Sequence, residues 1–113
     1  MNHPLRGEVW LVALDPTVGR EQAGTRPALV ISDDLFNQSH AELVVVLPIT
    51  SKNKGIRSHV AVIPPDGGLR LPGYVKCEDT RSVSLQRLGR RLGKIDAKTM
   101  GEVQARIRFI LAL

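Results

Sequence analysis

The sequence has a single cysteine, Cys77, among 113 residues, so a disulfide within one chain is impossible. Disulfide-stapled secreted scaffolds are therefore excluded, and one lone thiol favours a reducing, cytoplasmic location. The longest uncharged apolar run, residues 43–49, is far shorter than the roughly 20 residues of a membrane-spanning helix. The first residues carry Glu8 inside a short apolar run and lack a basic segment, unlike a secretory signal. We expect a protein without a membrane association.

Motifs for metal and nucleotide chemistry are also missing. Three scattered histidines (His3, His40 and His59) and Cys77 do not have the spacing of zinc ligands. No glycine-rich phosphate loop leads into a helix, so nucleoside triphosphate hydrolysis is not supported. Only four residues are aromatic, which leaves no platform on which several bases could stack. We therefore expect no metal and no cofactor.

Positive charge is what the sequence has in excess. Sixteen Lys and Arg against eleven Asp and Glu give a formal net charge of +5 and a pI near 10.0. A basic small domain favours a polyanionic partner, because phosphate contacts release counterions and supply affinity. Many small proteins are basic without such a partner, so charge alone does not establish one. The length suits one domain, residues 1–113, with a core of its own.

The hydrophobic pattern predicts short strands first and one helix last. Residues 7–14 are apolar on both alternating faces, which indicates a central strand. Further strands are predicted at 28–32, 42–49, 59–63 and 73–78, and residues 82–85 and 91–95 are expected to pair as a hairpin. Asp96 is placed to cap a helix. After it, apolar residues recur at helical spacing, namely Met100, Val103, Ile107, Ile110 and Leu111. We predict a mainly β, SH3-like small antiparallel barrel with short helices and a packed C-terminal helix.

Residues 7–31 read GEVWLVALDPTVGREQAGTRPALVI. This stretch resembles the opening of the MazF/PemK/Kid toxins, and the Asp-Pro, Glu-Gln and Arg-Pro pairs and the intervening glycines all fall in place. The later segments PITS (48–51), SHVAV (58–62) and KCEDTRSV (76–83) continue the match. The resemblance runs from Arg6 to Leu111. No single motif is decisive, but their joint order and spacing are highly specific.

This resemblance implies both a fold and a function. The fold would be the SH3-like barrel shared with the gyrase-poisoning toxin CcdB. The function would be metal-independent, sequence-specific cleavage of single-stranded RNA through 2′-hydroxyl attack, by the toxin of a type II toxin–antitoxin module. A homodimer, neutralised by the disordered tail of a cognate antitoxin, is implied as well. Two alternatives stay open: a CcdB-like inhibitor of a protein such as gyrase, and an RNA-binding module whose catalytic site has decayed.

Arg26 and Thr50 are the first two candidate catalytic residues. A guanidinium matches phosphate through two parallel hydrogen bonds and stays charged, so stabilising the transition state suits Arg26 better than proton transfer. The resemblance makes it the family's key arginine. Thr50 ends a buried apolar strand, where its hydroxyl could orient a phosphate oxygen or the attacking hydroxyl. Its alternative is a bond to its own backbone, and the resemblance favours function. Ser51 is a supporting contact.

Three positions depart from the plasmid toxins Kid and PemK. Those toxins carry histidine, arginine and aspartate at the positions that match Arg20, Lys76 and Glu78 here. Lysine cannot reproduce the guanidinium fork, so we do not expect their arrangement unchanged. Glu78 could act as a general base if Lys76 or Arg26 positions it. An exposed ion pair at a strand edge is an equal alternative for Glu78.

The remaining candidates are expected to contact RNA. Glu21 and Gln22 belong to the loop signature, where a structural role is equally compatible, and His59 is a contact or a fallback acid. Residues 51–57 form a cationic loop that could track the RNA backbone. A second basic cluster, Arg87, Arg90, Arg91 and Lys94, is either a solvated hairpin or a second strip of contact. The predicted RNA-contacting residues are Arg20, Glu21, Gln22, Ser51, Lys52, Lys54, Arg57, His59 and Lys76, beside the catalytic candidates Arg26, Thr50 and Glu78.

Overall fold

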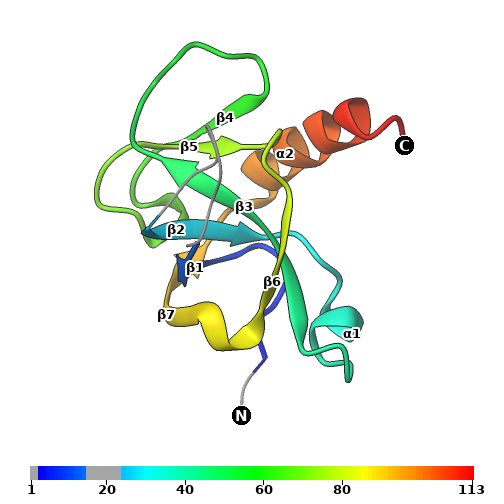
Figure 1. Cartoon of the computed structure of the whole chain (residues 1–113). Coiled ribbons are helices and arrows are strands. Elements are labelled where there is room, and N and C mark those ends of the chain that lie inside the picture. Colours follow the sequence, from blue (N-terminus) through cyan, green and yellow to red (C-terminus); the bar gives the residue numbers. More distant parts are fainter. Residues whose placement is uncertain (1–2, 15–23) are drawn as a thin grey trace.

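The computed structural model describes residues 3–14 and 24–113. Seven strands and two α-helices are arranged as in Figure 1. The strands are β1 (Glu8–Ala13), β2 (Thr25–Val30), β3 (Leu43–Thr50), β4 (His59–Val62), β5 (Gly73–Lys76), β6 (Arg81–Ser84) and β7 (Leu88–Lys94). The helices are α1 (Asp34–Asn37) and α2 (Ala97–Ile110), with short 3-10 turns η1 (Asp66–Gly68) and η2 (Leu85–Arg87). The prediction of a mainly β fold with a C-terminal helix is confirmed.

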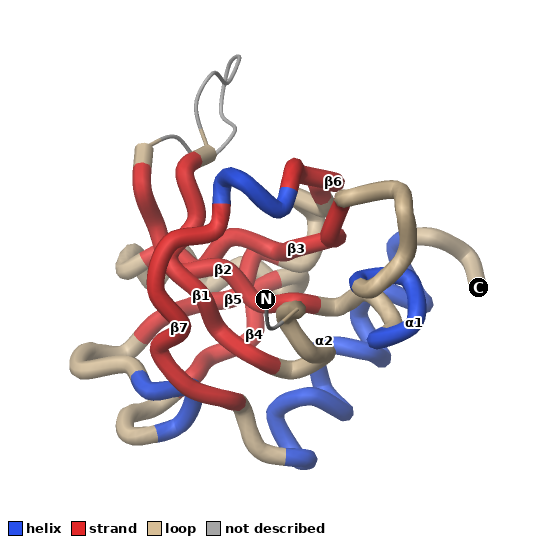
Figure 2. Tube along the Cα trace, turned by 90° about the horizontal axis from the view of Figure 1, so that it is seen from below, coloured by secondary structure: helices blue, strands red, loops and turns tan. Residues whose placement is uncertain are grey.

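All strand pairs are antiparallel, in the order β4-β5-β3-β2-β1-β7, and β6 pairs with β3 beside this path. The strands curve around a common centre, as Figure 2 shows. The barrel predicted from the sequence is not closed by strand pairing, because no ladder in the described part of the chain joins β4 to β7. The prediction that β1 is central is confirmed, since β1 lies between β2 and β7.

Two strand predictions need correction. Residues 82–85 and 91–95 do not form a hairpin: β6 pairs with β3, and β7 pairs with β1. The reason is that Val83 is buried in the apolar cluster that holds Val44, while the Ser84 hydroxyl accepts a bond from Gln86 N–H and caps η2, which redirects the chain. Strand β2 also begins at Thr25, before the predicted start at 28. Pro27 is tolerated because β2 has only β1 as its neighbour there.

The core lies on both faces of the central strands, which explains why they read as nearly continuous apolar runs. One cluster comprises Val9, Leu29, Leu47, Ile49, Val60, Val62, Val75, Cys77, Ile95 and Val103. The second, on the opposite face, comprises Val12, Leu14, Ala28, Val30, Val44, Val46 and Val83. Alternation along β1, β2 and β3 therefore sends successive side chains into two different clusters.

Helix α2 covers the first cluster with apolar side chains from two successive turns. Val103 is fully buried, and Met100 and Ile107 pack partly buried against the same cluster. The predicted cap is confirmed, because the Asp96 carboxylate accepts a hydrogen bond of 2.8 Å from Thr99 N–H. Ile110 and Leu111 are exposed, contrary to the apolar stripe expected from the sequence, because the end of α2 projects beyond the sheet (Figure 1). No helix in the described residues is long and apolar enough to cross a membrane.

Backbone contact between η1 and β7 joins the two sheet ends that no ladder connects. Gly68 has a φ of +71°, and a Cβ placed on it would lie 1.9 Å from the Leu92 carbonyl oxygen. A Cβ on Gly93 would lie 2.6 Å from the Gly68 nitrogen. Such short distances are possible only because neither residue has a Cβ, so the Gly67-Gly68 turn also packs against β7.

Candidate functional site

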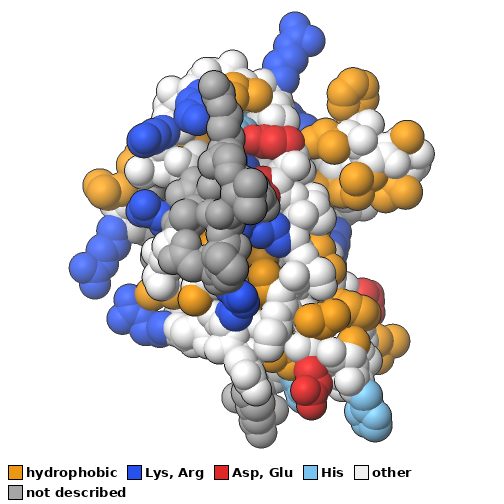
Figure 3. Space-filling view, viewed as in Figure 1, with side chains coloured by type: hydrophobic (Ala, Val, Ile, Leu, Met, Phe, Trp, Pro, Cys, Tyr) orange, Lys and Arg blue, Asp and Glu red, His pale blue; other side chains and the backbone are white. Residues whose placement is uncertain are grey.

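A cavity of about 990 Å³ opens where the start of β2 faces the ends of β3 and β5, and β7 forms its far wall. We call it the cationic groove. Seven of its lining residues are basic, namely Arg26, Lys52, Lys54, Arg70, Lys76, Arg90 and Arg91, and no Asp or Glu of the described residues lines it. Lys and Arg side chains gather on the left of Figure 3, the side where the loop before β5 lies in Figure 1. The charge of the groove suits a phosphate-rich ligand.

Arg26 and Thr50 line the same groove although they are on different strands. Arg26 is exposed on β2 and faces Val12 of β1 in the ladder. Thr50 is the last residue of β3 and is buried, and its Oγ1 accepts a 3.2 Å hydrogen bond from Lys52 N–H. The backbone bond considered as the alternative for Thr50 therefore exists. It uses a lone pair, so the hydroxyl hydrogen remains available for a phosphate oxygen.

Lys76 lies deep in the groove wall and shares its carboxylate partner with an arginine. Its Nζ is 3.7 Å from an Asp79 oxygen, and both Asp79 oxygens accept 2.8 Å bonds from Arg81. Asp79 thus holds a bidentate arginine and a lysine at once. In the described structure the ion-pair partner of Lys76 is therefore Asp79 and not Glu78. The Glu78 carboxylate is left for other partners.

Glu78 does not line the groove but stands directly behind a residue that does. Its two oxygens accept bonds from Ser58 Oγ at 2.8 Å and from His59 Nε2 at 2.9 Å. Burial would raise the pKa of Glu78, but its own backbone N–H, His59 and Ser58 together outweigh that effect and lower the pKa. Glu78 is therefore an ionised acceptor at neutral pH, positioned by His59 and not, as considered from the sequence, by Lys76.

His59 lines the groove from the first position of β4. The β4–β5 ladder places it opposite Lys76, and its side chain is only 5% exposed. With Nε2 bound to Glu78, the other ring nitrogen, Nδ1, is buried and has no hydrogen-bond partner in the described part of the chain.

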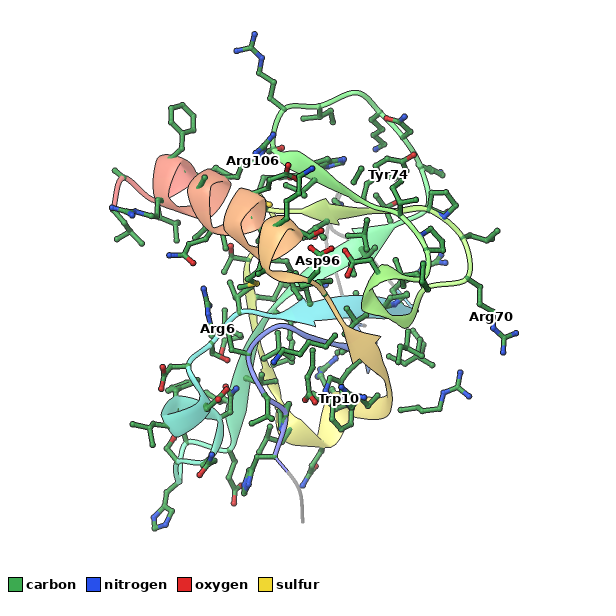
Figure 4. All side chains as sticks on the ribbon, turned by 180° about the vertical axis from the view of Figure 1, so that it is seen from behind. Arg6, Trp10, Arg70, Tyr74, Asp96 and Arg106 are labelled. Atoms are coloured by element: carbon green, nitrogen blue, oxygen red, sulfur yellow. The ribbon has the colours of Figure 1, made fainter. Side chains whose placement is uncertain are left out.

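The other predicted contacts divide into three groups. Ser51, Lys52 and Lys54 are exposed and line the groove. Arg57 is exposed but does not line it, and its carbonyl accepts a 2.9 Å bond from Arg106 of α2, labelled in Figure 4. The loop candidates Arg20, Glu21 and Gln22 lie outside the described residues.

The structure adds groove residues that the sequence did not single out. Arg70 extends from the loop between η1 and β5 (Figure 4), where apolar Leu69, Leu71 and Pro72 also line the groove. The only feature of the sequence near Arg70 is the preceding glycine-rich turn. A turn in the sequence does not show which part of the fold its neighbours will contact. Of the second basic cluster, Arg90 and Arg91 line the groove, whereas the Arg87 guanidinium bonds the Ala13 carbonyl.

The described residues contain neither a cluster of possible metal ligands nor a reactive thiol. No three His, Cys, Asp or Glu side chains of the described residues come together as possible metal ligands. Cys77 is fully buried. Burial, reinforced by the nearby Glu78 charge, raises the pKa of its thiol to about 12. A thiol so protonated is not a nucleophile at neutral pH.

Arg91 is held at the groove by the buried carboxylate of Glu8. One Glu8 oxygen accepts a 2.5 Å bond from Arg91 Nε, and the other accepts bonds from Leu5 N–H at 2.7 Å and the Trp10 indole at 3.1 Å. Burial acts to raise the pKa of Glu8, but these bonds outweigh it and lower the pKa below 4.5. The GEVW motif therefore carries an acid that orients a groove arginine.

Replacing Glu8 by glutamine is expected to lower the free energy of unfolding by about 2 kcal/mol at pH 7, because an amide N–H₂ would face the Arg91 donor. A lowered folded-state pKa gives stability that is complete above the unfolded pKa and lost as pH falls through the folded pKa. The difference between wild type and Glu8→Gln should thus shrink below pH 4.5. Denaturant unfolding at several pH values measures it. Glu102→Gln, exposed on α2, is the control, and a gap that stays constant with pH would contradict the expectation.

Comparisons with known proteins agree with this architecture. Residues 5–111 match the family model described as the PemK-like, MazF-like toxin of type II toxin–antitoxin systems. The chain is 42% identical to endoribonuclease PemK of Escherichia coli over 94% of this chain and 80% of that protein. The crystal structure of MazF from Deinococcus radiodurans superposes with a TM-score of 0.89 at 28% identity, covering all of both chains. A mycobacterial endoribonuclease in complex with its cognate antitoxin superposes with a TM-score of 0.82 at 29% identity, over 97% of this chain and 96% of that one. This chain belongs to the PemK-like, MazF-like family of type II toxin–antitoxin toxins.

Proposed function

We propose that this protein is a metal-independent endoribonuclease that cuts single-stranded RNA at short sequences and thereby inhibits translation and growth. The observation that carries the proposal is the cationic groove, in which Arg26 and Thr50 converge among six further Lys and Arg side chains. The similarity to relatives that are endoribonucleases, PemK of Escherichia coli among them, supports the same activity. A groove of this charge binds the phosphate backbone of RNA without reading its sequence.

The groove residues supply the electrostatics of 2′-hydroxyl attack. In-line attack on the adjacent phosphorus builds negative charge on the non-bridging oxygens. The Arg26 guanidinium offers two parallel donors to those oxygens, the Thr50 hydroxyl offers a third, and Lys76 adds a buried charge beneath them. The products are a 2′,3′-cyclic phosphate and a 5′-hydroxyl, and the step uses no metal.

Selection of a single strand follows from the apolar part of the groove. Leu69, Leu71 and Pro72 stand beside the cations, and unpaired bases can contact them, whereas a duplex keeps its bases stacked inside. With few aromatic side chains available, base identity is read by hydrogen bonds and small pockets rather than by a stacking platform. The two other functions considered from the sequence, protein inhibition and RNA binding without cleavage, do not need Arg26 and Thr50 in one groove.

Two protein partners belong to the proposal. We infer a homodimer, because Phe109 in the last turn of α2 is 87% exposed and Leu113, which follows the helix and lines a second cavity of about 380 Å³, is 76% exposed. Light scattering of the purified chain tests its mass. A cognate antitoxin with a disordered tail is the second partner, supported by the similar chain solved as a MazE–MazF complex from Deinococcus radiodurans, at 29% identity and a TM-score of 0.81.

The activity is tested by incubating the purified protein with a long single-stranded RNA in excess EDTA. We expect discrete cuts that end in 2′,3′-cyclic phosphate and 5′-hydroxyl groups. An RNA with a single 2′-deoxy nucleotide 5′ of the scissile phosphate is the matched control and should resist cleavage at that site. A folded protein that binds several RNAs and cuts none of them would overturn the enzyme proposal and favour a binding module, and one that binds none would favour a protein target.

A further inference from the structure

The carboxylate of Asp66 ties η1 to the first turn of α2. One of its oxygens accepts a 2.8 Å hydrogen bond from Asp96 N–H, and the other accepts a 2.7 Å bond from the Thr99 hydroxyl. Thr99 is buried, and Asp96, at the start of α2, is labelled in Figure 4. No ion pair among the described residues includes Asp66. Its carboxylate is therefore engaged with two neutral donors of another element, while η1 itself closes through backbone bonds.

These two bonds complete the cap of α2 with a residue from a distant part of the chain. In a capping box, the side chain at the third helical position accepts the N–H of the N-cap residue. Helix α2 has half of this pattern, since the Asp96 carboxylate accepts from Thr99 N–H. Asp66, 30 positions away, supplies the other half, because the Thr99 hydroxyl donates to Asp66 instead of reaching back. The same hydrogen bonds thus cap α2 and attach η1 to it.

The other sides of η1 are fixed by contacts that leave little room for a side chain. A Cβ on Gly67 would lie 3.2 Å from each of two core side chains, and one on Gly68 would lie 1.9 Å from the Leu92 oxygen. At the far end of the segment that follows η1, a Cβ on Gly73 would lie 2.6 Å from a side chain of β3. The four residues 69–72 therefore run between two ends that are packed in place.

Arg70 belongs to this four-residue segment and lines the cationic groove. Its side chain is exposed, and no hydrogen bond or ion pair among the described residues occupies its guanidinium. Arg91, another arginine of the groove, is in contrast held by Glu8. A guanidinium without a partner can bind a phosphate through two parallel hydrogen bonds, and a segment with fixed ends loses little backbone entropy when it does so.

We propose that Arg70 binds a second phosphate of the RNA strand, and that Asp66 is the positioning residue that holds Arg70 at the groove. Arg26 and Thr50 lie on β2 and β3, so the phosphate that is cut and the phosphate that Arg70 binds are held by different elements. Without the bonds from Asp66 to α2, η1 loses one of its attachments, and residues 69–72 start from a less defined position. The inference rests on the proposed ribonuclease function and concerns binding of the strand, not the bond-breaking step.

The direction of the effect of Asp66→Ala separates this role from simple electrostatics. Removing a negative charge from a protein that binds RNA would by itself strengthen binding. We expect the opposite, a rise in Kd of about fivefold at about 0.1 M salt, because one phosphate contact contributes about 0.7 to the slope of log K against log salt. That slope should become shallower by about 0.7. Both are measured by titrating an RNA with a 2′-deoxy nucleotide at the cut site over a range of salt concentrations.

Asp33→Ala is the matched control, because Asp33 also caps a helix. Its carboxylate accepts a 2.9 Å bond from Leu35 N–H at the start of α1. The control removes the same charge from a residue that does not line the groove, so it should bind RNA at least as tightly as wild type. If Asp66→Ala binds as tightly as this control, or keeps the salt slope of wild type, the inference is wrong.

Arg70→Ala shows whether Asp66 acts through the arginine. It should lose the same affinity and the same slope, and the double variant Asp66→Ala/Arg70→Ala should bind no more weakly than Arg70→Ala. Losses that multiply would contradict the positioning role. The single-turnover rate of bound RNA should stay within about threefold of wild type in all three variants, because Arg26 and Thr50 remain and only binding is affected. A larger loss of this rate would indicate a general distortion of the site and would also overturn the inference.

Thr99→Val and Thr99→Ser repeat the test without a change in charge and cover a failure of Asp66→Ala to fold. Thr99→Val removes the hydroxyl that donates to Asp66, whereas Thr99→Ser keeps it. We expect weaker RNA binding in Thr99→Val and nearly wild-type binding in Thr99→Ser, and equal affinities in the two folded variants would contradict the proposal. A wild type that binds no RNA would instead disprove the ribonuclease function, while a wild type that cuts RNA beside an Asp66→Ala variant of unchanged affinity leaves that function intact.

Discussion

Arg26→Ala is expected to lower the single-turnover rate of RNA cleavage about 1,000-fold, because its guanidinium is the planar double donor best suited to the charge that develops on phosphate. The variant should fold normally, since the Arg26 side chain is exposed and the backbone of β2 stays paired with Val12 of β1. A loss of rate at an unchanged melting temperature would therefore report on chemistry and not on folding.

Two further variants separate the geometry of Arg26 from its charge. Arg26→Lys keeps the positive charge but loses the fork, and we expect it to recover at most a small part of the rate. Lys98→Ala removes the same charge from α2, away from the groove, and should cut RNA as wild type does. If Arg26→Lys restores full activity, the arginine acts only as a point charge. Wild-type activity in Arg26→Ala would remove it from the site.

The strands could be predicted because local pattern determines them, whereas their partners could not. Residues 43–49 are apolar on both faces, and this alone indicates a buried strand. That β6 would join β3 instead of β7 depends on the burial of Val83 beside Val44, a contact between distant residues. The predicted burial of the end of α2 was wrong for a similar reason. Ile110 and Leu111 have the helical spacing of core residues, but the sheet that would cover them ends before they are reached.

In the candidate site, too, the features set by local sequence could be predicted and those set by strand pairing could not. Arg26 and Thr50 were proposed as site residues from the order of motifs along the sequence, and both line the groove. The bond between His59 and Glu78 joins residues 19 positions apart, and it forms because the β4–β5 register places His59 opposite Lys76, two residues before Glu78. Arg70 was not predicted because the sequence does not show which segment lies across from the turn that carries it, and so does not show that it lines the groove. Side-chain contacts that depend on the register between two strands therefore could not be predicted from this one sequence.

The contact of η1 with β7 closes the gap between the two sheet ends, and two glycines of similar backbone allow its contribution to be measured. Gly68 and Gly55 have φ values of +71° and +63°, so alanine is strained at both. Only at Gly68 would the new Cβ meet backbone, 1.9 Å from the Leu92 oxygen, whereas at Gly55 nothing lies within 4 Å. We expect Gly55→Ala to lower the free energy of unfolding by about 1 kcal/mol and Gly68→Ala by about 3 kcal/mol or more.

Denaturant unfolding of the two variants against wild type gives that difference directly, since the strain of positive φ cancels between them. Gly68, Leu69 and Leu92 also line the cationic groove, so a displaced η1 would move the wall that carries Arg70. Gly68→Ala should therefore bind uncleavable RNA less tightly than wild type even under conditions where it is fully folded. Equal losses of stability in the two variants would show instead that η1 relaxes away from β7 at little cost. In that case the positions of the edge strands β4 and β7 relative to each other would be maintained by the buried core and α2, without a contribution from η1.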